Sequence, residues 1–253
     1  MQNTHGLRRG ASVVLSLVAL IALPAPATAQ HGASIPARNV KWYEAVGAFG
    51  GIALISALDQ EVRSSVQSDR SGGKDDVSRV LRRMGEPEVF ATAGLGVLGV
   101  GLISGDRGIR ESGIRIVSAL GVAGVVASGV KLVVGRQRPD VSSRDQYGFK
   151  PFAGGSHLAF VSGHTTMAFA LAASVADEVH SAPVTVALYA LAAGTAWSRV
   201  NDDRHWLSDV VGGALVGIAS AKFASGRWTI LGARAPGFMI GPRGASIGYG
   251  MQF

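Results

Sequence analysis

The chain contains no cysteine among its 253 residues. Disulfide bonds and thiolate metal sites are therefore excluded, and the fold must be stabilised by packing. Charged residues are scarce at 16% and aromatic residues at 7%, and we find no nucleic-acid-binding motif and no basic stretch interleaved with aromatic side chains. We therefore expect no nucleic-acid partner.

Apolar residues are abundant instead. They make up 47% of the chain, and the mean hydropathy of +0.29 is high for a soluble protein but below that typical of a bundle fully embedded in lipid. The formal net charge is +7. This charge favours anionic partners such as phosphate esters or anionic lipid, although an ordinary basic surface explains it equally well.

The N-terminus has the features of an export signal. Arg8 and Arg9 precede a short apolar run, Ala11 to Leu23, and small residues at 27–29 offer a cleavage site. We expect residues 1–29 to be a signal peptide. The alternative is an uncleaved membrane anchor, but the run is short of the ~20 apolar residues that cross a bilayer.

The rest of the chain alternates apolar runs with polar connections. This pattern predicts an all-α bundle of about six or seven helices over residues 30–227, interrupted by a long loop over 135–161. The expected helices are Val40 to Ser65, Asp75 to Arg83, Pro87 to Ile103, Ile109 to Val134, His164 to Val179, Ala182 to Trp197 and His205 to Ser225.

Residues 228–253 differ from the bundle, because apolar residues alternate there with small or polar ones. The run 238–240 and the alternating run that ends at Phe253 predict a short β-hairpin across the turn 242–244. A C-terminal Phe on such a strand resembles the end of outer-membrane barrel proteins, but one hairpin cannot close a barrel. We expect a small hairpin packed on the bundle.

Lys131 and Arg138 are the first pair of candidate ligands for an anion. If one helix ran through both, their spacing of about two turns would place them on one face, although Pro139 disfavours helix at Arg138. A guanidinium and an ammonium at a helix end can clamp a phosphate dianion. Two solvated surface cations are the simpler interpretation of this pair alone.

The second candidate is the tripeptide Ser162-Gly163-His164 before an apolar run. Free backbone N–H groups at a helix start bind anions, and Gly163 lets the backbone approach a ligand closely. Ser162 can either cap the helix or donate to phosphate. His164 has the ordinary pKa of a general acid near neutral pH, or it has a structural role.

The third candidate lies between Ser198 and Asp209. His205 and Asp209 are four residues apart at an expected helix start, so the carboxylate can orient the imidazole as a nucleophile. A simple helix pair explains these two residues almost as well. Arg199 can reach the same phosphate. The residues expected to face solvent are Asp202, Asp203 and Arg204.

A zinc site is the competing interpretation of the histidines. His157, His164, His205 and Asp209 are possible ligands, but no tight ligand spacing such as HExxH is present. The nearby cations would also oppose a bound metal ion. We therefore expect no metal.

The joint order Lys-x6-Arg-Pro, Ser-Gly-His and Ser-Arg-x5-His-x3-Asp resembles the PAP2 superfamily of phosphatidic acid phosphatases, bacterial acid phosphatases and vanadium haloperoxidases. The resemblance covers roughly 121–221 and implies a helical phosphatase that needs no metal or other cofactor. It implies that His205 becomes phosphorylated and that His164 protonates the leaving group. The implied phosphate ligands are Lys131, Arg138, Ser162, Gly163 and Arg199.

The predicted function is a metal-independent phosphatase acting on phosphate monoesters, lipid phosphates or pyrophosphates through phospho-His205. One alternative is a vanadate-dependent haloperoxidase, although the larger haloperoxidases carry insertions that this chain lacks. The other is an inactive phosphate-site relic with a binding or structural role in the envelope. The inactive relic is considered because Val161 stands where the family usually has proline, directly before Ser-Gly-His.

The location follows from the signal peptide and the apolar runs. Three long helices precede the first-motif loop, so if all of them crossed a membrane, Lys131 would lie on the cytoplasmic side. A periplasmic site requires that not all of them cross. We expect an exported envelope protein, periplasmic or membrane-associated, with a soluble or lipid phosphate ester as its partner.

Overall fold

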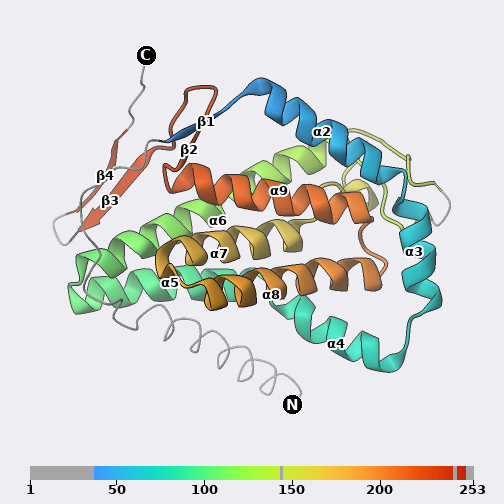
Figure 1. The fold of residues 1–253 in the computed structure, drawn as a ribbon, viewed down its shortest axis with the longest axis horizontal. Coiled ribbons are helices and arrows are strands. Elements are labelled where there is room, and N and C mark those ends of the chain that lie inside the picture. The colour runs from blue at the N-terminus through green and yellow to red at the C-terminus, as the bar shows by residue number, and fades with distance from the viewer. Residues whose placement is uncertain (1–36, 143–144, 242–243, 249–253) are drawn as a thin grey trace.

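The computed structural model describes residues 37–142, 145–241 and 244–248. The predicted all-α bundle is confirmed (Figure 1). Its helices are α2 (Trp42–Ser56), α3 (Asp59–Ser68), α4 (Gly72–Arg83), α5 (Pro87–Ser104), α6 (Arg107–Val134), α7 (Gly163–Val179), α8 (Ala182–Asn201) and α9 (Leu207–Ala224), with a 3-10 turn at Gly155–His157. The expected signal peptide lies outside the described residues.

Local signals at the helix ends explain most of these boundaries. The Ser71 side chain accepts a hydrogen bond from the N–H of Lys74 at the start of α4, and Asp106 does the same for Ile109 in α6. Gly105 and Gly135 end α5 and α6 in the left-handed conformation that glycine adopts without strain.

The single helix expected over 40–65 is wrong, because the chain bends by 49° between α2 and α3. Asp59, the first residue of α3, is fully buried there. A buried carboxylate needs hydrogen-bond donors, and Asp59 finds them on Ser208 of α9. The bend therefore delivers this carboxylate to a partner that a straight helix would not reach.

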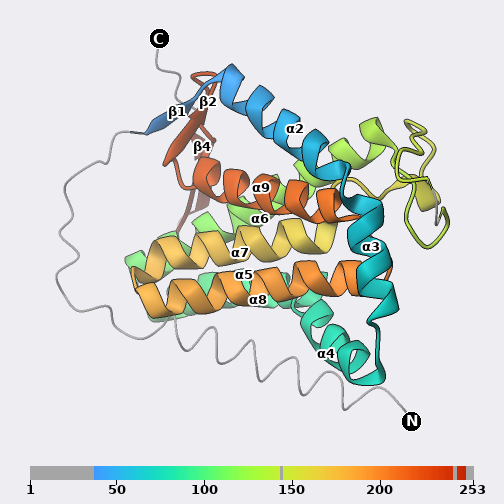
Figure 2. The same cartoon turned by 45° about the vertical axis from the view of Figure 1, so that its right-hand side comes forward.

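Helix α7 lies at the centre of the bundle and packs on α6, α8 and α9, while α5 packs on α6 (Figures 1 and 2). Close approach of α7 and α9 depends on small residues. A Cβ on Gly217 would lie 2.3 Å from the Thr166 carbonyl oxygen, and one on Gly213 would lie 2.8 Å from that of Ser162. The main apolar core lies among α5, α6, α7 and α8.

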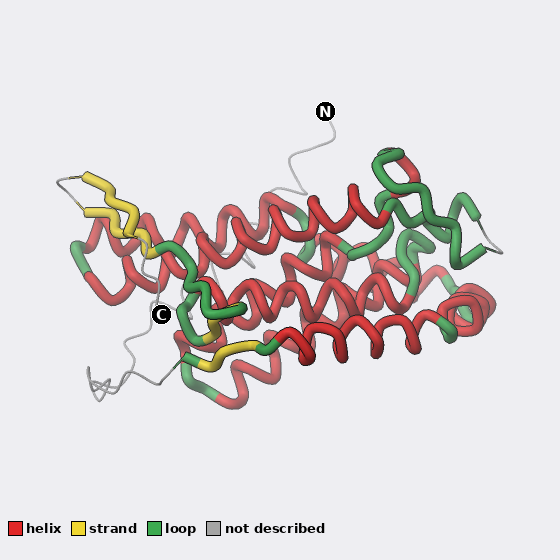
Figure 3. Tube along the Cα trace, turned by 90° about the horizontal axis from the view of Figure 1, so that it is seen from above, coloured by secondary structure: helices red, strands yellow, loops and turns green. Residues whose placement is uncertain are grey.

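The predicted C-terminal hairpin is present as β3 (Gly237–Gly241) and β4 (Gly244–Gly248), which pair antiparallel with Phe238 opposite Ile247. The end of the alternating run, at 249–253, lies outside the described residues. A second pair was not predicted: β1 (Arg38–Val40) pairs parallel with β2 (Trp228–Ile230). Figure 3 shows the hairpin at one end of the bundle and the long loops at the other.

Several helices are long and apolar enough to cross a membrane. Among the described residues these are Gly72–Ser104, Arg107–Val134 and Leu207–Ala224, and α2 with α3 also qualifies if the bent pair is taken as one span. In α6, only 28% of the residues in the most apolar stretch are buried inside the protein. Much of its apolar surface therefore faces outward, which is typical of a membrane helix rather than a soluble bundle.

Candidate active site

The three sequence segments meet at the end of the bundle that carries α3, α4 and the long loop (Figure 1). Lys131 and Arg138 do not share a helical face, because α6 ends at Val134, as the sequence predicts. Gly135 has a φ of 58°, and a Cβ there would lie 2.0 Å from the Lys150 carbonyl oxygen. The chain therefore turns at Gly135, and Arg138 reaches the site from the loop.

Lys131 points from the last turn of α6 toward the start of α7. Its Nζ donates to the Leu158 carbonyl oxygen at 2.7 Å, and its Cε would lie 3.5 Å from a Cβ placed on Gly163. The backbone at Gly163 therefore lies directly beside the Lys131 side chain. Lys131 and the N-terminal amides of α7 thus bound the same space.

Two guanidinium groups, those of Arg138 and Arg199, complete the set of positively charged side chains at the site. The Nε atoms of Arg138 and Arg199 are buried and have no hydrogen-bond partner within the described residues. Arg199 also donates from NH1 to Asp202 at 3.0 Å, which holds the side chain in place. Burial lowers the pKa of Arg199 to about 10, and neighbouring Arg82, Arg204 and Arg138 add to the effect. Buried, unpaired donors of one sign are what an anion-binding site provides.

Ser162 does not cap α7 with its side chain. Its fully buried hydroxyl instead accepts a hydrogen bond from Thr165 Oγ1 at 3.0 Å, which leaves its own hydrogen available for a ligand oxygen. The Ser162 N–H donates to the Asp209 carbonyl oxygen at 3.0 Å. This bond joins the start of α7 to the start of α9. Val161 before it is buried beside Ala127 and Phe160.

His205 and Asp209 do meet, but not on one helical face as expected. His205 precedes α9, Trp206 is the N-cap, and Asp209 is the third residue of the helix. The Asp209 Oδ2 accepts from the Trp206 N–H at 2.9 Å and lies 3.5 Å from His205 Nδ1. Asp209 thus faces Nδ1, and Nε2 is the ring nitrogen left to act as a nucleophile.

The electrostatics of the site keep both histidines neutral. Burial lowers the pKa of His205 to about 4 and outweighs the opposing effect of Asp209, while Lys131 and Arg199 lower the pKa slightly further. Burial also lowers the pKa of His164 to about 3, and Arg199 and His205 lower it further. A neutral His205 has a free lone pair for attack. A bound phosphate dianion would raise the pKa of His164, as a general acid requires.

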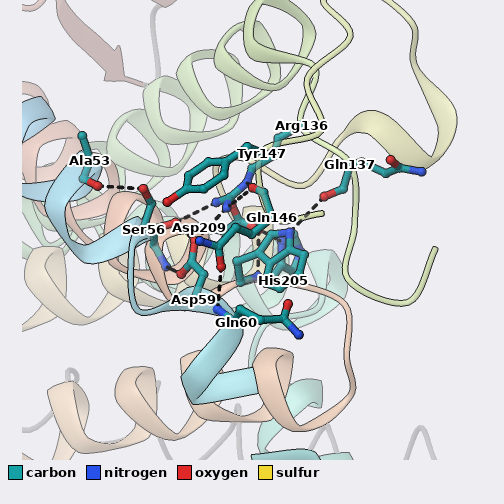
Figure 4. A network of polar contacts seen from close by, with 12 residues as sticks. Ala53, Ser56, Asp59, Gln60, Arg136, Gln137, Gln146, Tyr147, His205 and Asp209 are labelled. Carbon is teal, nitrogen blue, oxygen red and sulfur yellow. Dashed lines mark hydrogen bonds and ion pairs between the residues drawn. The ribbon is translucent and has the colours of Figure 1, made fainter. Parts of the chain in front are cut away.

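The sequence did not identify the residues that hold Asp209. Arg136 donates to Asp209 Oδ1 at 2.8 Å and to Asp59 Oδ2 at 2.7 Å, and all three side chains are buried (Figure 4). An acidic residue inside the apolar run 40–65 was the available signal for Asp59. Nothing in the sequence indicates a role for Arg136, except that it lies between Lys131 and Arg138.

The expectation that the acidic pair before His205 faces solvent is wrong. Asp203 forms two hydrogen bonds of 2.6 Å with Arg63, and Asp202 accepts one of 2.7 Å from Ser78. The Arg63–Asp203 ion pair and the Ser78–Asp202 hydrogen bond tie the loop before α9 to the α3–α4 segment. Arg204 is partly exposed and pairs with Asp140. In the part of the chain that is described, no three or more acidic or histidine side chains gather as a metal site would need.

The fold and the site define a class: a helical bundle with one buried anion cradle and a histidine–carboxylate pair. Residues 112–229 match the model of the PAP2 superfamily. This match confirms the resemblance to that superfamily that the three motifs predict.

Individual relatives are consistent with this assignment. A segment of 105 residues, 40% of this chain, is 40% identical to the lipid A 1-phosphatase of Porphyromonas gingivalis. The chain spans only 20% of the length of that relative. The activity named for the relative therefore does not by itself establish the activity of this chain.

Two solved structures share the fold. The crystal structure of Aquifex aeolicus LpxE aligns with a TM-score of 0.54 at 21% identity, over 66% of this chain and 94% of LpxE. A transmembrane PAP2-type phosphatidylglycerolphosphate phosphatase from Bacillus subtilis aligns with a TM-score of 0.57 at 20% identity, over 73% of this chain and 95% of that enzyme. At these identities the likeness establishes the fold alone.

Proposed function

We propose that this protein is a metal-independent phosphatase that hydrolyses lipid phosphate esters through a phosphohistidine on His205. One observation carries the proposal. The buried Nε atoms of Arg138 and Arg199, which have no hydrogen-bond partner among the described residues, occur together at the end of the bundle where the three PAP2 motifs meet. Leaving such donors without partners costs free energy unless a ligand satisfies them, and a phosphate group does so.

The proposed reaction has two steps, and the same phosphate-binding residues serve both. In the first, His205 Nε2 attacks phosphorus, the ester P–O bond breaks, and the leaving oxygen takes a proton from His164. In the second, water attacks the phosphohistidine, His164 takes up the water proton, and the P–N bond breaks to release phosphate. Asp209 orients the ring and stabilises the positive charge that forms on it.

The cations act on the phosphoryl oxygens throughout both steps. Lys131, Arg138 and Arg199 balance the negative charge that spreads over those oxygens in the transition state. Ser162 and the Gly163 N–H donate hydrogen bonds from the helix start. Since these donors are fixed by packing before substrate arrives, little reorganisation is needed during the reaction.

The outward-facing apolar helices favour a lipid as the carrier of the phosphate. Exposed side chains such as Leu102 and Ile103 on α5 and Val125 on α6 fit the hydrocarbon region of a bilayer. A cavity of about 350 Å³ between α2 and α9 is lined almost wholly by apolar side chains, and its wall includes Phe160 and Val161 just before Ser162. We therefore propose a membrane-embedded bundle over residues 30–227, with 1–29 as signal peptide and 228–253 as an extension.

The proposal is tested by phosphate release from a phosphatidate-type lipid and from a soluble monoester, each in detergent with EDTA. We expect turnover in EDTA, preference for the lipid, and loss of turnover in His205→Ala. Full activity of His205→Ala would contradict the mechanism. A wild-type protein that binds vanadate without turning over any ester would instead support the inactive relic.

A further inference from the structure

A buried charge cluster lies behind the His205–Asp209 pair. Arg136 is 2% exposed, and its guanidinium joins two carboxylates that are both fully buried, those of Asp59 and Asp209 (Figure 4). Its Nε and NH2 also donate to the Gln146 carbonyl oxygen, and NH1 donates to Ser208 Oγ at 2.7 Å. Every N–H group of the planar Arg136 guanidinium is therefore engaged in a hydrogen bond.

The cluster joins three elements that are distant in sequence. Asp59 is the first residue of α3, Arg136 follows α6, and Ser208 and Asp209 lie in the first turn of α9. Asp59 Oδ1 accepts from the Ser208 N–H at 2.8 Å, and its Oδ2 accepts from the Ser208 hydroxyl at 2.6 Å. The two carboxylates are therefore held on either side of one guanidinium.

This arrangement fixes which oxygen of Asp209 faces the nucleophile. Arg136 occupies Oδ1, so Oδ2 is left for the Trp206 N–H and for His205 Nδ1. One arginine between two carboxylates also leaves a net charge of −1 behind His205. In low dielectric, a net negative charge there favours the positively charged ring that forms on phosphorylation.

We propose that Asp59 and Arg136 are positioning residues for His205, fixing the rotamer of Asp209 and the charge that faces the imidazole. The assignment rests on the proposed function, since phosphorylation of His205 is the step that these residues serve. Asp59 lies outside the three motifs, and Arg136 occupies a spacer position between the two cations of the first motif. Both residues act on His205 through Asp209 rather than through contact with phosphate.

The charge effect is measurable without turnover, by following the His205 ring with nitrogen-15 NMR during a pH titration. The charged or titratable groups that face His205 are Asp209, Lys131, Arg199 and His164. Asp59→Asn removes a negative charge behind Asp209, so the pKa of His205 falls. Arg136→Gln removes a positive charge, so the same pKa rises. Shifts in opposite directions support the proposal, and unchanged or parallel shifts overturn it.

Kinetics test the positioning role. In both variants we expect kcat for a soluble phosphate monoester to fall about 10- to 100-fold, as a misplaced catalytic group causes, with KM changed less than about 2-fold. Arg136→Lys should restore the charge and the pKa of His205 but not kcat, because an ammonium cannot bridge both carboxylates. A fall in kcat/KM that comes from KM alone would contradict the assignment.

Arg115→Met is the matched control for loss of a paired arginine. Arg115 forms two 2.7 Å hydrogen bonds with Glu178, and it lies four helical turns before Lys131 on α6. We expect this variant to lower thermal stability while kcat and the pKa of His205 stay unchanged. If the wild type and this control both lack turnover, the proposed function fails, whereas the NMR titration still decides the charge assignment.

Discussion

At the scale of single residues, His164 must change protonation state as it works. Its pKa is about 3 because it is buried and faces Arg199 and His205. A bound dianion cancels those cations, so the pKa rises and a proton is taken up from solvent above pH 3.

We therefore predict that vanadate binding at pH 6 is accompanied by uptake of up to one proton. Calorimetry in two buffers with different ionisation enthalpies measures this number directly. His164→Asn should bind vanadate with no uptake. Equal uptake by the wild type and the variant would show that another group carries the proton.

The motif residues could be predicted from the sequence because their types and order constrain them tightly. Lys131, Ser162 and His205 were expected together, and the structure brings their segments to one end of the bundle. The contact between Asp59 and Arg136 could not be predicted, because the two residues are 77 positions apart and nothing local pairs them. A charged residue that is buried in the fold can be recognised in the sequence only as an exception within an apolar run.

At the scale of elements, the site depends on how closely α9 approaches α7. Gly217 marks the closest approach, since a Cβ there would lie 2.3 Å from one backbone atom and 2.9 Å from another. Backbone atoms of a packed helix cannot move aside easily. A substitution must therefore push the two helices apart and displace Ser162 and Asp209 with them.

We predict that Gly217→Ala destabilises the protein by about 1–3 kcal/mol, as overpacking does, and lowers activity as well. Gly124→Ala is the matched control, since a Cβ on Gly124 meets nothing within 4 Å. It should be neutral or stabilising by up to about 1 kcal/mol, because alanine is the better helix former. Thermal unfolding in detergent measures both. Equal changes in stability in the two variants would show that close packing of α9 on α7 is not the reason for the loss.

Helix boundaries were predicted to within a few residues where a cap or a glycine marks them, as Asp106 and Gly135 do for α6. The bend between α2 and α3 was missed, since no proline or glycine occurs at Ala57 and Leu58 and its cause is a tertiary contact. The pairing of β1 with β2 was missed for a similar reason. Strands of three residues are too short to show a period of two.

In the whole molecule, the outer faces of α5 and α6 need a lipid environment if the bundle is embedded as proposed. Val125 is 75% exposed in the apolar stretch of α6, whereas Val77 is 53% exposed on the charged helix α4. Lysine in the centre of a bilayer costs about 2.5–3.5 kcal/mol, but lysine on a wet surface costs almost nothing.

We predict that Val125→Lys strongly reduces the amount of protein retained in membranes after an alkaline wash, while Val77→Lys leaves it unchanged. The wild type should resist the wash. Release of the wild type into the soluble fraction would contradict the embedded bundle. It would leave a soluble envelope phosphatase as the alternative.

The proposed mechanism depends on transfer of a phosphoryl group to His205. The most direct measurement is rapid alkaline quenching of the enzyme during turnover of a ³²P-labelled ester, followed by peptide mapping. We expect acid-labile, alkali-stable label on the peptide that contains His205 in the wild type, and none in His205→Ala. Turnover by the wild type with no label on that peptide would contradict the proposed mechanism.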